Sequence, residues 1–199
     1  LPVLTTNGSN NYGPHHFPKK LIPLVIHNAV AGKLLTIYGD GQQIRDWLDG
    51  KDHCGAIRSV LEAGRLGETY NIGGHNEKQN IEVVQAICAL LDARGPREDG
   101  LARTSQFTYV ADRPGHDRRY AINASKISNE LGYAPRRDFA AGFAETLAWY
   151  LDNGDWWSAL LDTACARRRV HSGAVNPRLA CGPPGAAKNG AWPGGRCHP

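Results

Sequence analysis

Hydrophobic patterns of two kinds alternate along residues 3–151 and then stop, and this alternation constrains the fold more than any other feature of the sequence. Apolar residues spaced for strands and apolar residues spaced for helices follow one another. Strands are predicted at 3–6, 34–38, 44–48, 68–72 and 107–110, and helices at about 18–31, 51–63, 80–94, 124–131 and 139–151. This order is compatible with an open α/β fold, in which ligands bind beyond the carboxyl ends of the strands.

Some boundaries carry signals of their own. Residues 3–6 are expected to end a buried strand, and the Asn- and Gly-rich stretch 7–14 is expected to form turns. Asn80 is predicted as the N-cap of its helix, and Gly95 as the residue that ends it. The last helix is predicted to bury one side, because four apolar residues recur at i+4 spacing: Phe139, Phe143, Leu147 and Leu151.

The segment 158–199 differs in kind. Eleven of its 42 residues are glycine or proline, and it shows no sustained periodicity. We therefore expect a folded part, 1–157, and a disordered, unrelated basic tail, 158–199. Six of the 23 basic residues and one of the 19 acidic ones lie in this tail, which leaves 17 and 18 in the body, a net charge of −1. That balance is not typical of a nucleic-acid-binding domain, so no nucleic-acid partner is expected.

The sequence also bears on compartment. No apolar run approaches the roughly 18 residues needed to span a bilayer, and the first residues lack the basic and apolar regions of a signal peptide. The five cysteines are then expected as reduced thiols in a cytoplasmic protein, and their spacing suggests no metal site. There is no methionine, and the chain begins with Leu1, which favours a start that has been cut away.

Polar side chains that could bind a ligand follow the first predicted strand. Asn10 and Asn11 precede Tyr12-Gly13-Pro14. An Asn amide there can donate to a sugar or phosphate oxygen and accept from a hydroxyl. A plain Asn/Gly turn is the alternative interpretation.

Cations near element ends form a second group of candidates, Lys20, Arg45, Arg113 and His116. A diphosphate requires several donors, and arginine supplies planar, bidentate ones. Taken singly, each is more often a solvated surface residue. The segment 113–119 is harder to explain in that way, because three arginines and a histidine flank a Pro-Gly turn at which the backbone can approach an anion.

Tyr38, at the end of its predicted strand, could stack on a nucleobase or simply pack into the core. Two expected catalytic features are absent. The body has no Gly-rich dinucleotide fingerprint, and none of the seven tyrosines has a lysine four residues later. No catalytic residue is therefore predicted in this chain.

Taken together, the motifs resemble the dTDP-glucose 4,6-dehydratases of the extended short-chain dehydrogenase/reductase superfamily. The resemblance is nearly continuous from residue 2 to 157. It is carried by Ser9 to Pro14, Phe17 to Pro23, Tyr38 to Leu48, Tyr70 to Lys78, Ala111 to Ile122 and Trp149 to Asn153. It implies the C-terminal part of an NAD(P)-binding Rossmann-type fold with its nucleotide-sugar-binding lobe, the Gly-rich N-terminal half being absent.

The resemblance also implies roles for individual residues. Asn11 matches a cofactor contact, with NAD as the cofactor. The positions that match contacts to the dTDP-sugar substrate are Asn10, Lys20, Leu21, Thr36, Ile37, Tyr38, Arg45, Asn80, Arg113, Pro114, Gly115, His116 and Asp117. Thr36 to Tyr38 match the strand that holds the base, whereas Arg45, Asn80 and 113–117 match groups around the diphosphate and sugar.

The family reaction implied is an internal redox cycle that converts dTDP-glucose to dTDP-4-keto-6-deoxy-glucose. The family's tyrosine base, its lysine, its water-eliminating acids and its dimer-forming helices precede the Asn-Tyr-Gly-Pro segment, so we expect this chain to be inactive alone and the usual homodimer helices to be missing. Asp49-Gly50-Lys51 departs from the Tyr-Val-acid common in the family, and we expect it to weaken the strand before it.

Three hypotheses remain open. The chain is the substrate-binding part of a deoxysugar-pathway lyase, or a non-catalytic dTDP-sugar-binding module completed by another chain, or a truncated product that barely folds. Another nucleotide-sugar epimerase or dehydratase of the same superfamily is a further alternative.

Overall fold

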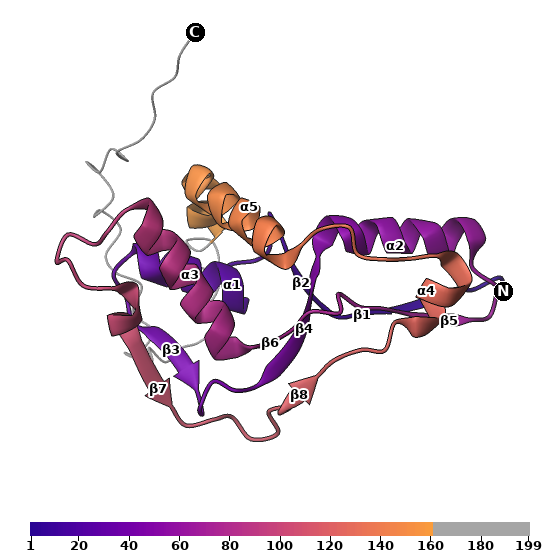
Figure 1. Cartoon of the computed structure of the whole chain (residues 1–199), viewed down its shortest axis with the longest axis horizontal. Helices are drawn as coiled ribbons and strands as arrows, with labels where there is room; N and C mark the ends of the chain where they lie inside the picture. The colour runs from indigo at the N-terminus through magenta and orange to yellow at the C-terminus, as the bar shows by residue number, and fades with distance from the viewer. Residues whose placement is uncertain (161–199) are drawn as a thin grey trace, which may run out of the picture. The chain divides into compact units, whose positions relative to one another are not determined.

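A computed structural model describes residues 1–160 of the 199-residue chain, and Leu1–Ser158 form one compact unit. The expected tail falls, from residue 161 onward, outside the described residues. The elements are β1 (Thr5–Gly8), β2 (Asn10–Tyr12), α1 (Leu21–Val30), β3 (Leu35–Tyr38), β4 (Ile44–Asp49), α2 (Gly50–Ala63), β5 (Thr69–Ile72), β6 (Glu77–Gln79), α3 (Asn80–Arg94), the 3-10 helix η1 (Arg103–Gln106), β7 (Phe107–Val110), β8 (Arg119–Tyr120), α4 (Ser125–Leu131) and α5 (Phe139–Asp152) (Figure 1). Residues 154–160 are also helical, so the described start of the expected tail, 158–160, is not irregular.

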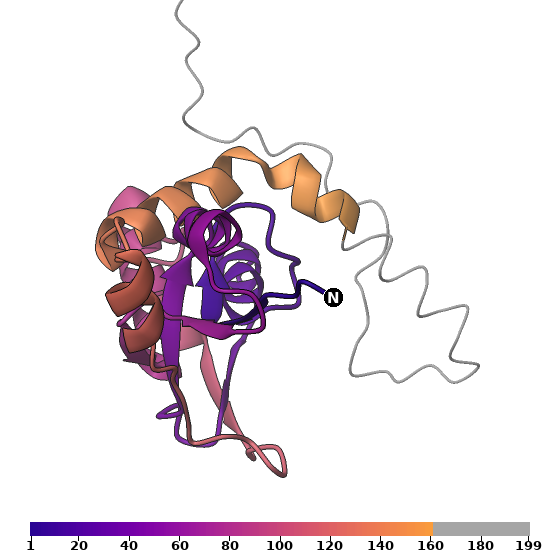
Figure 2. The same cartoon turned by 90° about the vertical axis from the view of Figure 1, so that its right-hand side faces the viewer.

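Most strand pairs are parallel, which confirms the α/β class. β1 pairs with β5, β2 with β4, and β3 with β7, all in parallel. β4 also pairs antiparallel with β6 and parallel with β8, so it is the strand with the most neighbours in the described part of the chain. Helices α2 and α5 both lie above the strands in Figures 1 and 2.

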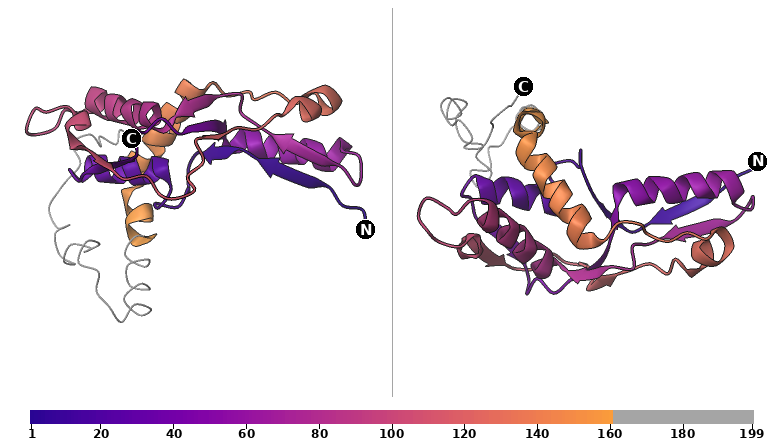
Figure 3. Two further views of the ribbon diagram at one scale, coloured as in Figure 1. Left: turned by 90° about the horizontal axis from the view of Figure 1, so that it is seen from below. Right: turned by 45° about the horizontal axis from the view of Figure 1, so that its top comes forward.

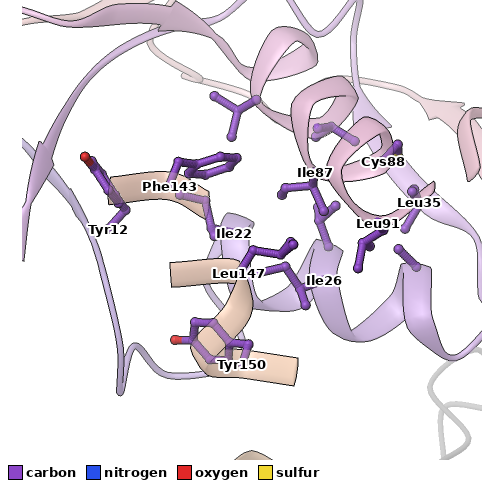
Figure 4. Packing of buried hydrophobic residues seen from close by; sticks show 14 of the residues in the cluster. Tyr12, Ile22, Ile26, Leu35, Ile87, Cys88, Leu91, Phe143, Leu147 and Tyr150 are labelled. Carbon is purple, nitrogen blue, oxygen red and sulfur yellow. The ribbon is translucent and has the colours of Figure 1, made fainter. Parts of the chain in front are cut away.

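β4 separates two hydrophobic cores, because successive side chains on a strand point to opposite faces. Trp47 packs into the larger core with α1, α3 and α5, and Leu48 packs into the smaller core with α2, α4 and β5. Figure 4 shows side chains from α1, α3 and α5 meeting in the larger core, among them Ile26, Ile87 and Leu147. Burying one such side chain contributes about 1.5–3 kcal/mol.

The helix predictions hold with small corrections. α3 ends at Gly95 as expected, but its N-cap is Gln79 rather than Asn80. The reason is a capping box, in which the Glu82 carboxylate accepts from the Gln79 N–H at 2.6 Å and Gln79 in turn caps the Glu82 backbone. In α5 the buried side includes Tyr150 rather than Leu151, since a strict i+4 row drifts around a helix of 3.6 residues per turn.

Three short strands escaped prediction. Residues 10–12, expected as a turn, form β2, because their backbone pairs with β4 across a long separation in sequence. β6 and β8 are likewise stabilised by pairing with β4 rather than by local propensity. That Asp49-Gly50 weakens β4 stays a prediction, but Asp49 has a role that the sequence did not reveal. It is the buried last residue of β4, and its carboxylate caps α2 by accepting from the Lys51 N–H at 2.7 Å.

The first strand differs most from its prediction. It lies at Thr5–Gly8 rather than 3–6, and its residues alternate between exposed and half-buried. α2 runs alongside β1 and β5 in Figures 1 and 3, so one face of this pair is covered. Within residues 1–160, no helix is long and apolar enough to cross a membrane, and no cluster of His, Cys, Asp or Glu is arranged to hold a metal ion.

Candidate functional site

The face presented by β3 and β7 carries the residues that the sequence assigns to a nucleobase. Thr36 and Tyr38 are exposed, whereas Ile37 is buried, so Ile37 can offer a ligand its backbone but not its side chain. β7 pairs with β3 in parallel, and Tyr38 lies beside Val110. Tyr38 as a residue is 51% exposed at the strand end, so the core-packing alternative for it is wrong.

The turn 113–117 follows directly from β7. Its backbone closes through a hydrogen bond from the His116 N–H to the Arg113 carbonyl at 3.2 Å. Gly115 adopts a positive φ of 70°, a conformation that glycine tolerates without steric cost. The Arg113 side chain is exposed and makes no hydrogen bond or ion pair with any residue in the described part of the chain. It is therefore available to a ligand.

Arg45 holds this turn from below. The residue is 8% exposed, and its guanidinium Nη1 donates to the Asp117 carbonyl at 3.0 Å and to the Ile44 carbonyl at 2.6 Å. The Ile44 N–H donates to the Arg118 carbonyl at 2.9 Å. Arg45 is thus a buried brace of the turn rather than a solvated cation.

The start of α3 is bonded to the loop between β3 and β4. The Asn80 N–H donates to the Gln43 carbonyl at 3.0 Å, and the Ile81 N–H donates to the Gly41 carbonyl at 2.9 Å. These bonds bring Asn80, the start of β4 with Arg45, and the end of β3 around one loop, 39–43. Tyr38, Arg45, Asn80 and the turn 113–117, which are dispersed in sequence, therefore lie around one region of the fold.

Asn10 and Asn11 lie on β2, directly beside β4. Asn10 pairs with Trp47, two positions beyond Arg45, and Asn11 pairs with Leu48. As neighbours on a strand, their side chains point to opposite faces. The Asn11 amide is held on both sides, since its Nδ2 donates to the Ser9 carbonyl at 3.3 Å and its Oδ1 lies 2.9 Å from Nδ1 of His53.

Lys20 and Leu21 form the start of α1. Lys20 is the N-cap position and makes no side-chain capping bond, whereas Leu21 packs against the larger core. Burial lowers the pKa of the neighbouring His16, and the Lys20 ammonium lowers it further. No hydrogen bond among residues 1–160 joins Lys20 or Leu21 to the turn 113–117.

Two groups in this region escaped the sequence interpretation. Gln43 and Asp112 are hydrogen-bonded to each other at 2.8 Å, although 69 residues separate them. His116 Nδ1 lies 2.6 Å from Asp112 Oδ1, and this hydrogen bond is the main reason why the pKa of the Asp112 carboxyl is lowered. No periodic or local signal marks such a long-range polar pair.

A separate cavity of about 410 Å³ lies between the end of β4 and the segment 135–139. None of the residues assigned to a ligand from sequence lines it. Its carboxylates already have partners within the chain: Asp49 lies 3.3 Å from the Arg137 guanidinium, and Asp52 accepts from the Arg136 and Arg137 N–H groups at 3.0 and 2.9 Å. Both of these carboxylates are thus paired within the chain.

Three buried tyrosines are unsuited to act as bases. Burial raises the pKa of Tyr133 to about 12 and that of Tyr150 to about 12, and it raises the pKa of Tyr12 as well. A tyrosine base requires the opposite, a pKa lowered toward the working pH by a nearby cation.

A comparison with known families decides the lineage. The model of the GDP-mannose 4,6 dehydratase family matches residues 1–146. The chain belongs to this family. Within it, the dTDP-glucose 4,6-dehydratase of Xanthomonas campestris pv. campestris (strain ATCC 33913) is 64% identical over 170 residues, which cover 85% of this chain and 48% of that protein.

Solved structures agree with this dehydratase lineage. The dTDP-glucose 4,6-dehydratase of Bacillus anthracis in complex with NAD is 52% identical, with a TM-score of 0.71, over 80% of this chain and 48% of that one. The enzyme of Streptomyces venezuelae with NAD and TYD bound is 44% identical, with a TM-score of 0.74, over 80% and 47%. The resemblance inferred from the motifs is confirmed, and the chain spans about half the length of the curated relatives it matches.

Proposed function

We propose that this chain is the nucleotide-sugar-binding part of a cytoplasmic dTDP-glucose 4,6-dehydratase of deoxysugar biosynthesis. The observation that carries the proposal is the convergence of Tyr38, Arg45, Asn80 and the turn 113–117 around the loop 39–43. These residue types match the parts of a nucleoside diphosphate sugar, with an aromatic ring for the base and cations for the phosphates.

In this proposal, the turn 113–117 binds the diphosphate. The Arg113 guanidinium is exposed and free of intramolecular bonds among the described residues, and Gly115 keeps the backbone accessible. Arg45 adds buried positive charge beneath the turn. Pro114, His116 and Asp117 complete the assigned set, with Lys20 and Leu21 contributing from the start of α1.

Asn10 and Asn11 are assigned to different ligands, the substrate and the cofactor. Because their side chains point to opposite faces, we assign Asn10 to the sugar and Asn11 to NAD, which supplies the hydride acceptor when it is bound. Asn11 fits this role in part, since the bonds to Ser9 and His53 leave its amide one free N–H. One donor does not hold a dinucleotide, so Asn11 would supply only a small part of the NAD contacts.

The binding proposal is tested with the full 199-residue chain and dTDP. A ligand that binds only the folded state raises its melting temperature, so dTDP is expected to stabilise the chain. Arg113→Ala should weaken dTDP binding by about tenfold or more, because hydrogen bonds to charged groups contribute about 1.5–3 kcal/mol. Arg58→Ala, which removes an exposed arginine paired with Glu62 on α2, is the matched control and should bind normally. The absence of any shift at millimolar dTDP contradicts the proposal.

We also propose that the chain alone does not turn over dTDP-glucose. It has no Tyr-x-x-x-Lys pair, and buried tyrosines with raised pKa values cannot replace one. Purified chain incubated with dTDP-glucose and NAD should form no 4-keto product. Formation of that product by the chain alone overturns this part of the proposal.

A binding module completed by further polypeptide is the second candidate, and the open edge of β1 favours it. The Thr5 and Ser9 N–H groups donate to β5, at 3.1 and 3.0 Å to the carbonyls of Glu68 and Ile72, so Thr6 and Gly8 direct theirs the other way. No strand in the described part of the chain pairs there. Far-ultraviolet circular dichroism and a cooperative melt of the isolated chain separate a folded module from a truncated product that barely folds.

A further inference from the structure

Gln43 is a buried amide at the junction between β3 and the turn 113–117. The residue is 2% exposed and lies just before β4. Its Nε2 donates to the Tyr38 carbonyl at 3.1 Å and to Asp112 Oδ2 at 2.8 Å. A single side-chain group therefore links the strand end that carries Tyr38 to the segment that opens the turn.

The orientation of this amide is dictated by its partners. A carbonyl and a carboxylate both accept, so only the NH₂ side of Gln43 can face them. The opposite atom, Oε1, is buried and has no hydrogen-bond partner among residues 1–160. Leaving a buried acceptor unsatisfied costs about 1–3 kcal/mol of folding free energy. The two hydrogen bonds donated by Nε2 are therefore made although Oε1 stays unpaired.

Asp112 is also bonded to residues of the turn. Its Oδ1 accepts from the Arg113 N–H at 2.9 Å and lies 2.6 Å from His116 Nδ1. The His116 side chain is only 9% exposed, so this contact fixes the far side of the turn as well. The Asp112 carboxylate thus holds both ends of 113–116 at once.

Close backbone approach makes the link possible. Gly39 follows Tyr38 with a positive φ of 58°, and its N–H donates to the Val110 carbonyl at 2.9 Å. A Cβ at Gly39 would lie 3.2 Å from both Asp112 Oδ2 and Gln43 Nε2. Any side chain at this position would press on the hydrogen bond between them.

We propose that Gln43 and Asp112 are positioning residues that set the distance between Tyr38 and Arg113, and so couple recognition of the base to recognition of the diphosphate. The proposal rests on the proposed function. A ligand that spans both sites benefits only when the two are held at the right separation, because preorganised contacts avoid the cost of ordering on binding. Neither side chain needs to touch the ligand.

The test compares Gln43→Leu, which keeps the volume and removes the donor, with Gln42→Leu at the exposed neighbouring glutamine. Dissociation constants for dTDP are measured by calorimetry, and amide hydrogen exchange of residues 113–117 is measured without ligand. Gln43→Leu should weaken dTDP binding about tenfold and speed exchange in the turn. Gln42→Leu should change affinity by less than about twofold. Equal exchange rates, or unchanged affinity, in the Gln43 variant overturn the proposal.

Asp112→Ala gives a second route if Gln43→Leu does not fold, since the Asp112 side chain is 36% exposed and its truncation leaves no cavity in the core. It should produce the same two effects. If the unmodified chain fails to bind dTDP, the proposed function fails, while the exchange measurement still decides whether Gln43 and Asp112 order the turn.

Discussion

The region around the loop 39–43 and the β1–β5 region differ in how their backbone hydrogen-bonding groups are satisfied. Around the loop, three segments distant in sequence are tied together by hydrogen bonds, from Gln43 to Asp112, from Arg45 to Asp117 and from the Asn80 N–H to the Gln43 carbonyl. At β1, the backbone of Thr6 and Gly8 faces an edge with no partner in the described part of the chain. One region is assembled by this chain's own contacts, and the other presents an unfinished sheet.

The two regions also differ in which groups are left without a partner, side chains in one and backbone groups in the other. Around the loop, the uncommitted groups are side chains, the Arg113 guanidinium and the Tyr38 ring, which suit a small ligand. At β1 they are backbone groups in a strand without charge or proline, an arrangement that readily templates another strand. Exposed Val3, Leu61 and Leu66 lie in or beside the elements of this second region. We therefore expect ligand binding in the first region and polypeptide association in the second.

The largest effect is expected where the two regions join, at Gly74. A Cβ there would lie 2.0 Å from the Trp47 carbonyl oxygen, against the backbone of β4. Gly74→Ala should destabilise the protein by at least about 3 kcal/mol, because backbone cannot yield as a flexible side chain can. Gly55→Ala in α2 meets no atom and should be neutral or slightly stabilising. Urea denaturation measures both, and equal stabilities would show that the two regions are not held together through β4.

A proline pair tests the open edge. Thr5→Pro removes an N–H that bonds to the Glu68 carbonyl and should cost about 1–3 kcal/mol, because that carbonyl loses its donor. Thr6→Pro removes an N–H that faces the edge and should cost far less. The comparison is made by thermal melts of the isolated chain. If Thr6→Pro proves as damaging as Thr5→Pro, the edge already has a partner.

Two exposed tyrosines test which face of the β3–β7 pair binds the base. Tyr38→Ala should weaken dTDP binding by about 1–3 kcal/mol, the usual contribution of an aromatic ring that stacks on a base. Tyr109→Ala is the control, since Tyr109 is exposed on β7 but pairs with Ile37 and so faces the other side of the strand pair. Calorimetric titration should leave the Tyr109 variant unchanged. Equal losses would place the base elsewhere.

The smallest effect concerns pH. Burial lowers the pKa of His27, on α1, and that of His53, on α2 against Gly8 of β1. A histidine with a lowered folded-state pKa binds protons more weakly than it does when unfolded. Stability is then complete above about pH 6.5 and falls as the pH drops below that value. Melting curves between pH 8 and 5 should show this fall, and it should be shallower in His27→Gln. A flat profile would contradict it.

Much of the architecture follows from the sequence, and the exceptions share one cause. The five helices and the strands β3, β4, β5 and β7 were predicted within a few residues, because each carries its own hydrophobic period. β2, β6 and β8 were missed, since each is two or three residues long and owes its form to pairing with β4. The capping role of Asp49 was missed for a similar reason, because it depends on where β4 ends.

By itself, the sequence determined the family and the types of groups that could meet a nucleotide sugar, because motifs and residue chemistry are local. Tertiary structure decided which groups remain free and which are used as braces. Arg45 and Arg113 look alike in sequence, yet one is buried against the Asp117 carbonyl and the other is exposed without a partner among the described residues. Only the fold sets such partners, since hydrogen bonds between residues some 70 positions apart depend on how strands pair and not on neighbouring residues.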